Sequence, residues 1–94
     1  MLYVRRIVGD SMLPGYYPGS LIVLRRFRRL YVGDVVMLRH NGSEKIKRIA
    51  GLRPGEVFVL GDNPGSSSDS RDYGWLPEAS VSAKVLFPKH PKPE

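Results

Sequence analysis

The stretch VVMLRHNGSEKIKRIA, residues 35–50, contains two strand-forming segments on either side of an Asn-Gly pair. Val35–Arg39 is rich in apolar and β-branched residues, and Glu44–Ala50 returns with charged and apolar residues interleaved. Asn41 and Gly42 are the residues that two-residue hairpin turns favour, because both tolerate a positive φ. The stretch therefore predicts an antiparallel β-hairpin.

Short strands are predicted along the rest of the chain as well. Each run is rich in β-branched or aromatic residues and is bounded by Gly, Pro or polar turn residues. No stretch long enough for an ordinary helix shows helical periodicity. Together with the hairpin these runs predict an all-β fold of six strands, a small barrel or sandwich of short, mostly antiparallel strands. The four further runs are Leu2–Val8, Ser20–Leu24 (expected to be buried on both faces), Glu56–Leu60 and Val81–Phe87.

The chain has 94 residues, which suits one small domain. We expect residues 1–88 to form this domain and residues 89–94 to be a flexible tail rich in Pro and Lys. A polar loop with four serines, residues 64–72, precedes the last strand. There is no cysteine, and two histidines are too few for a histidine-based metal site, so neither a metal nor an organic cofactor is expected.

The net charge is +6, and much of it lies in one segment that contains Arg25, Arg26, Arg28 and Arg29. Such a cluster is either a solvated basic turn or a contact for an acidic partner, an anionic membrane surface or nucleic acid. No aromatic RNA-binding signature or basic recognition helix accompanies it. We therefore expect a candidate contact with anionic or membrane surfaces, and no nucleic-acid partner.

The apolar runs are too short to cross a membrane, which requires roughly twenty residues. Arg5 and Arg6 also interrupt any apolar region of a signal peptide. The chain as given is expected to be soluble and cytoplasmic, or membrane-associated if it is part of a longer, anchored protein.

A hydroxyl group is displayed by the turn GDSMLP, residues 9–14. Gly9 permits backbone angles that are closed to other residues, and Pro14 fixes φ downstream. Ser11 is therefore exposed with a defined direction. A serine is a weak nucleophile unless a base lies beside it.

A base could come from the second strand of the hairpin. Because side chains alternate between faces, one residue of the pair Lys47 and Arg48 should point into the fold. A lysine among apolar neighbours has a lowered pKa and, when neutral, accepts a proton from a serine. The alternative is a solvated lysine on an edge strand, where lysine opposes aggregation.

The residues of the motifs and their order along the chain favour the catalytic interpretation. The sequence resembles the bacterial type I signal peptidases, a family of Ser–Lys proteases, over almost its whole length. Four blocks carry the resemblance in order: GDSMLP at 9–14, GDVV at 33–36, KRIAG at 47–51 followed by PG at 54–55, and GDN at 61–63 with Ser67, DSR at 69–71 and YG at 73–74.

The resemblance implies Ser11 as nucleophile, Lys47 as general base and Ser67 as the residue that orients the lysine amine. Asp69 would pair with Arg71 or Arg48 and hold the last block over the site. A serine next to the lysine accepts an N–H without adding a charge that would raise the lysine pKa.

At the position two residues before the nucleophile, some members of that family have a serine that helps to bind the oxyanion. This chain has Gly9 there, so the oxyanion would depend on backbone N–H groups, chiefly that of Ser11.

These motifs predict a serine endopeptidase that removes an N-terminal pro- or signal segment from a precursor protein. Its compact length resembles the soluble branch that matures nickel-type superoxide dismutase, whereas a membrane-anchored type I signal peptidase is the alternative. A self-cleaving repressor also joins Ser-Met to a later lysine, but lacks the last block. A different class of function is a non-catalytic basic β-domain that binds nucleic acid or anionic lipid through its arginines.

Overall fold

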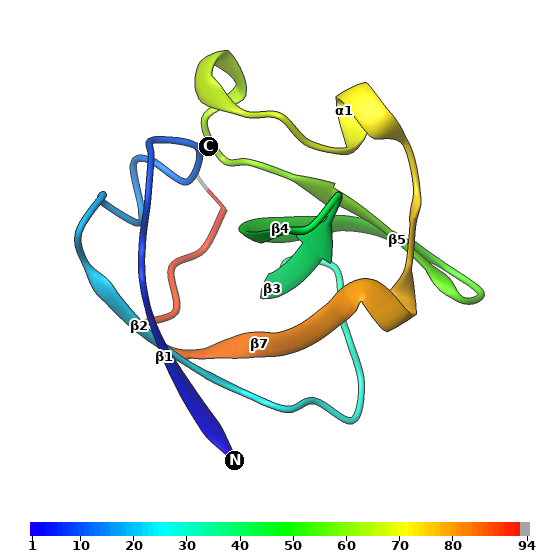
Figure 1. The fold of residues 1–94 in the computed structure, drawn as a ribbon, viewed down its shortest axis with the longest axis horizontal. Helices are drawn as coiled ribbons and strands as arrows, with labels where there is room; N and C mark the ends of the chain where they lie inside the picture. Colours follow the sequence, from blue (N-terminus) through cyan, green and yellow to red (C-terminus); the bar gives the residue numbers. More distant parts are fainter. Residues whose placement is uncertain (93–94) are drawn as a thin grey trace.

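The computed structural model describes residues 1–92. This part of the chain consists of strands and loops, with only three short helical elements (Figure 1). The helical elements are η1 (Pro64–Ser66), α1 (Ser70–Tyr73) and η2 (Glu78–Ser80). The strands are β1 (Leu2–Arg6), β2 (Leu21–Arg25), β3 (Val35–His40), β4 (Ser43–Arg53), β5 (Glu56–Leu60), β6 (Leu76–Pro77) and β7 (Val81–Phe87).

The strands form one sheet in the order β1-β2-β7-β3-β4-β5-β6, and every neighbouring pair is antiparallel. The predicted all-β class is confirmed. Among the described residues the sheet is open, with β1 and β6 at its edges. Three bulges interrupt the ladders and increase the local twist.

The predicted hairpin is β3 and β4, paired from Val35 with Arg48 to His40 with Ser43. Asn41 and Gly42 connect the strands with φ of 50° and 77°. Both values are positive, as predicted for this turn. Strand β4 continues three residues beyond the predicted end at Ala50, to Arg53.

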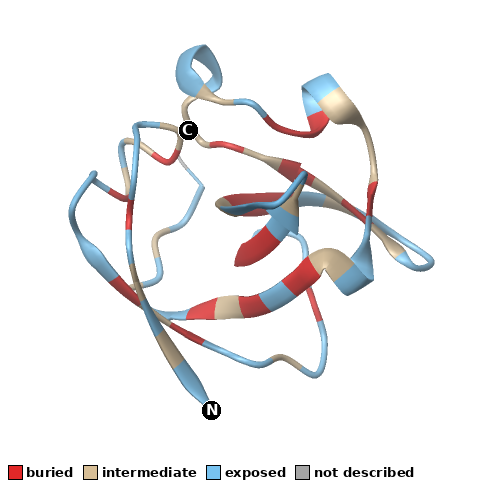
Figure 2. Cartoon of the chain, viewed as in Figure 1, coloured by how far each residue is buried: buried red, intermediate tan, exposed pale blue. Residues whose placement is uncertain are grey.

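Two hydrophobic cores lie on opposite faces of β3, because its side chains alternate between them. Strand β3 is therefore buried on both faces, whereas buried and exposed residues alternate along β7 (Figure 2). The first core contains Ile7, Met12, Tyr16, Ile22, Leu24, Val35, Met37, Ala83 and Val85. The second contains Leu30, Val36, Leu38, Ile49, Val57, Val59, Leu76 and Val81.

Two expectations about strand burial are wrong. Strand β2 buries Ile22 and Leu24 on one face only, and Leu21 on the outer face is 53% exposed, since no element of the described chain covers it. In β4, both Lys47 and Arg48 are buried, each 5% exposed. Alternation places them on opposite faces, but both faces of β4 are covered at this point.

The cover over Arg48 includes the residues after β7. The Tyr16 hydroxyl donates to the Pro88 carbonyl at 2.8 Å and accepts from the His90 N–H at 3.2 Å. The His90 carbonyl in turn accepts from Arg48 Nη2 at 2.9 Å. Pro93 and Glu94, the end of the predicted tail, lie outside the described residues.

Candidate active site

The serine turn is a loop whose two ends are joined and whose middle is anchored in the first core. The Ile7 N–H donates to the Ser20 carbonyl at 2.8 Å, and the Gly19 N–H donates to the Ile7 carbonyl at 2.8 Å. Gly9 has φ of 77°, as its predicted turn role requires. Met12 is only 1% exposed and holds the half-buried Ser11 beside it against the core.

Lys47 lies on β4 with its amine directed at Ser67. Its Nζ donates to Ser67 Oγ at 3.2 Å. Burial lowers the pKa of Lys47 below its ordinary value of 10.5, and the positive charge of Lys45 lowers it further. Asp69 opposes this effect and Arg71 adds to it, but the net direction is downward. Lys47 has the environment that a neutral lysine base requires.

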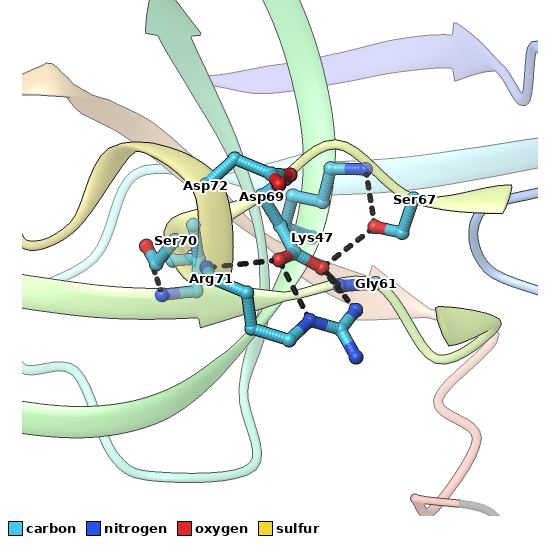
Figure 3. A network of polar contacts seen from close by, with 8 residues as sticks. Lys47, Gly61, Ser67, Asp69, Ser70, Arg71 and Asp72 are labelled. Carbon is cyan, nitrogen blue, oxygen red and sulfur yellow. Dashed lines mark hydrogen bonds and ion pairs between the residues drawn. The ribbon is translucent and has the colours of Figure 1, made fainter. Parts of the chain in front are cut away.

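Ser67 lies between Lys47 and Asp69 (Figure 3). While it accepts from Lys47, its own hydroxyl proton is donated to Asp69 Oδ2 at 2.7 Å. The carboxylate therefore fixes the direction of the hydroxyl, and a lone pair of Ser67 faces the lysine. Asp69 makes no direct hydrogen bond or ion pair with Lys47 within residues 1–92.

Asp69 is fully buried, and within residues 1–92 its carboxylate accepts five hydrogen bonds. Burial alone would raise its pKa, but the bonds from Arg71, the Gly61 N–H and Ser67 outweigh burial, so the pKa is well below its usual range. The neighbouring carboxylate raises the pKa of Arg71. Asp69 also caps α1 in a reciprocal capping box with Asp72. The loop is thus fixed around a carboxylate whose charged form is strongly favoured.

The serine loop and the loop after β5 meet at Gly61–Asn63. The Asn63 N–H donates to the Ser11 carbonyl at 2.8 Å, and Asn63 Nδ2 donates to the Asp10 carbonyl at 3.1 Å. A Cβ on Gly61 would lie 2.8 Å from the Ser11 carbonyl oxygen, 2.6 Å from Ser67 Cβ and closer still to Ser67 Oγ. Ser11, Lys47 and Ser67 therefore belong to one junction of three chain segments.

Of the two arginines predicted as possible partners of Asp69, Arg71 pairs with it and Arg48 does not. Arg48 instead forms two hydrogen bonds with Asp62, at 2.9 and 2.8 Å, and the side chains are 6% and 2% exposed. It also donates to the Gly33 carbonyl at 2.9 Å. Arg48 faces away from Ser67 because the two residues of the pair Lys47-Arg48 lie on opposite faces of β4.

The pair of Arg48 and Asp62 yields a stability prediction. Asp62→Ala would leave a buried guanidinium without its counter-charge, and we expect it to lower the free energy of unfolding by about 3–5 kcal/mol. Glu56→Ala is the control, because it breaks the pair with Arg53 whose side chains are 50% and 38% exposed, at a cost of about 1 kcal/mol or less. Urea denaturation measures both. Equal losses would contradict the structural role of Asp62.

Among residues 1–92 the side chains of Ser11 and Lys47 are not hydrogen-bonded to each other. Within residues 1–92 the Ser11 hydroxyl makes no hydrogen bond, and the Lys47 amine bonds only to Ser67. Catalytic hydrogen bonds are often long without substrate and shorten when it binds. Among the described residues the Ser11 hydroxyl is thus without a partner, and one N–H of the Lys47 amine is bound to Ser67.

A groove of about 270 Å³ runs beside Ser11 between β1 and β4. Both walls have free strand edges in the described chain: β1 pairs only with β2, and the part of β4 before Arg48 pairs only with β3. Such edges accept an extended peptide as an added strand. The groove is lined by Arg5, Arg6, Ile7, Val8, Ser11, Met12, Glu44, Lys45 and Ile46.

Comparison with known protein families places the chain in a peptidase family. A family described as Peptidase S24-like matches residues 1–74, which include Ser11, Lys47 and the loop to Tyr73. The chain belongs to the Peptidase S24-like family.

Curated relatives of this peptidase-family chain are named as proteases. It is 32% identical to signal peptidase I of Bacillus caldolyticus, over 90% of this chain and 52% of the relative. It is 29% identical to the mitochondrial ATP-independent inner membrane protease subunit 1a of Arabidopsis thaliana, over 84% and 65%. It is 46% identical over 33 residues to a probable signal peptidase I-1 of Synechocystis, covering 35% and 17%.

The chain thus spans about half to two thirds of the length of the first two relatives. Their names support the predicted resemblance to signal peptidases, and none of them mentions superoxide dismutase. Within residues 1–92, no helix is long and apolar enough to cross a membrane.

Three residues of the junction carry roles that sequence reasoning missed. Gly61 provides space for Ser67, Asn63 binds the serine loop, and Asp62 neutralises Arg48. All three lie in the GDN block that the resemblance identified. The resemblance therefore signalled that this block matters. It could not reveal the contacts of the three residues, because their partners lie in distant parts of the chain.

Proposed function

We propose that this chain is the catalytic part of a serine endopeptidase in which Ser11 is the nucleophile and Lys47 the general base. One observation carries the proposal: the Lys47 amine is buried and hydrogen-bonded to Ser67, at the junction that also holds Ser11. Burial lowers the pKa of this amine. Membership of a peptidase family supports the reaction class.

In the proposed reaction, the neutral Lys47 amine removes the hydroxyl proton as Ser11 Oγ attacks the scissile carbonyl. The resulting ammonium passes this proton to the leaving amine as the peptide C–N bond breaks. Lys47 then removes a proton from water, whose oxygen attacks the acyl carbonyl, and it returns this proton to Ser11 Oγ as the ester C–O bond breaks. Ser67 holds the amine in position throughout, and its bond to Asp69 keeps its lone pair on the lysine. The Ser11 N–H beside Gly9 is the proposed oxyanion donor.

The proposed substrate is an extended N-terminal segment of a precursor protein, bound as a strand in the groove beside Ser11. Signal segments are favoured by the names of two relatives. The precursor of nickel superoxide dismutase is the other proposed substrate, based on the resemblance to that maturation branch.

Incubation with candidate precursors, followed by sequencing of the new N-terminus, tests the function. We expect one defined cut with the wild type and a loss of about 10⁴-fold or more in kcat for Ser11→Ala. Ser66→Ala makes the same chemical change at an exposed serine and should keep full activity. Cleavage that survives Ser11→Ala would refute the proposed nucleophile.

The arginine loop favours a second candidate function, binding of anionic surfaces. Arg25, Arg26, Arg28 and Arg29 are exposed and line a cavity of about 350 Å³ with Tyr31 and Lys84. Salt-sensitive binding to anionic vesicles that survives Ser11→Ala but is lost when the four arginines are neutralised would support this function.

A further inference from the structure

The groove beside Ser11 has one apolar part and one charged part. Ile7, Val8, Met12 and Ile46 form the apolar part of its lining. The charged part has three cations and one anion, so its net charge is positive. These residues are Arg5, Arg6, Lys45 and Glu44.

Two of the three cations are already engaged. Arg5 Nε forms an ion pair with Glu44 Oε1 across the groove, from β1 to β4, at 2.8 Å. Arg6 Nη1 donates to the Gly19 carbonyl at 2.6 Å. Within residues 1–92, the half-buried Lys45 makes neither an ion pair nor a side-chain hydrogen bond. Arg6 keeps its charge, since a carbonyl does not neutralise it, but Lys45 is the groove cation whose side chain has neither kind of partner among these residues.

Lys45 is also placed to contact a peptide that reaches Ser11. It precedes Lys47 by two residues on β4, so both side chains lie on the same face of the strand. Its main chain belongs to the free edge of β4, to which an extended peptide would pair. A substrate side chain directed toward this face would meet the Lys45 ammonium.

We propose that Lys45 selects substrates with an Asp or Glu side chain at one fixed position near the cleaved bond. This inference rests on the proposed function and names its substrate class. A partly buried ammonium without a partner gains a charge-assisted hydrogen bond from a carboxylate, while the neutral amide of Gln or Asn offers less. The expected preference for the acidic residue is about tenfold to a hundredfold in kcat/KM.

The test is cleavage of a mixed library of extended peptides by the full chain, with the residues around each cut identified by mass spectrometry. A matched pair of peptides, Glu against Gln at the selected position, then gives kcat/KM. We expect Asp and Glu to be enriched at one position, and the preference to shrink at high salt. Lys45→Gln should abolish it, and Lys45→Glu should reverse it toward Lys and Arg. Lys89→Gln, which removes a charge outside the groove, should leave it unchanged.

Different outcomes separate this inference from the proposed function. Cleavage that depends on Ser11 but shows no acidic preference, or a preference that persists in Lys45→Gln, would overturn the inference alone. If nothing is cleaved in a Ser11-dependent way, the proposed function fails. NMR titration of Ser11→Ala with the Glu and Gln peptides, each with the residue at its centre, then decides the inference: tighter binding of the Glu peptide that requires Lys45 supports it, and equal binding overturns it.

Discussion

Lys47→Met is expected to abolish peptide cleavage while leaving the protein at least as stable as the wild type. Methionine has a similar length and no amine, so it fills the space of Lys47 but cannot accept a proton. We expect kcat/KM to fall by about 10⁴-fold or more. Ser67 keeps its hydrogen bond to Asp69, and the cost of burying an amine disappears. Peptide cleavage and thermal unfolding measure the two effects.

The stability gain should depend on pH in a defined direction. Because the pKa of Lys47 is lowered in the folded protein, the wild type carries the cost of a buried ammonium at low pH. That cost falls as the pH rises from the folded pKa toward 10.5, the value expected for the unfolded chain. The advantage of Lys47→Met should therefore be largest below the folded pKa and smallest near pH 10.5.

The pH dependence of activity should also follow the ionisation of Lys47. A lysine base must be neutral, so wild-type kcat/KM should rise with pH and level off below pH 10.5. Lys89→Met, at an exposed position, is the matched control and should change neither activity nor its pH profile. Retention of most of the activity in Lys47→Met would mean that the base lies elsewhere.

Gly61→Ala is expected to reduce activity by about 10²-fold or more, although it adds a single methyl group. That methyl would overlap Ser67 and approach the Ser11 carbonyl to 2.8 Å, and neither the Ser67 Cβ nor the backbone of Ser11 can rotate away. One of the two serines must move, and a displacement of about 1 Å in an active site costs this much. Overpacking should also lower stability by about 1–3 kcal/mol.

Gly65→Ala provides the control in the same loop. The nearest neighbour of its added methyl is Asn63 Oδ1, at 3.9 Å, so there is space for it. We expect wild-type kcat/KM and a change in stability below about 0.5 kcal/mol. If Gly61→Ala cleaved as fast as Gly65→Ala, the close packing at Gly61 would have no bearing on catalysis.

Local chemistry was sufficient to predict much of the fold. Asn41 and Gly42 specify a turn that joins β3 to β4, because their φ preferences act independently of the rest of the chain. The short strand β6 was not predicted, since two residues carry no periodicity. The outer face of β2 was predicted as buried because an apolar run does not reveal what covers it.

The candidate site was predictable in its residue types but not in all its contacts. Alternation predicted that Lys47 or Arg48 points inward, yet Arg48 is buried too, since Asp62 and the His90 carbonyl reach it from distant segments. The resemblance left Arg71 and Arg48 as possible partners of Asp69, and only the folded chain shows that Asp69 pairs with Arg71. Such long-range partners depend on tertiary structure.

The two bonds of Asn63 to the serine loop have a mechanical consequence. They fasten the Asp10 and Ser11 carbonyls to the segment that leads to Ser67, so thermal motion should displace the two serines together as a rigid body. The separation between Ser11 and Ser67, which binds the Lys47 amine, would then fluctuate less than either loop does alone. In hydrogen exchange, the Asn63 amide should be among the slowest of its loop, and it should open only when the serine turn detaches.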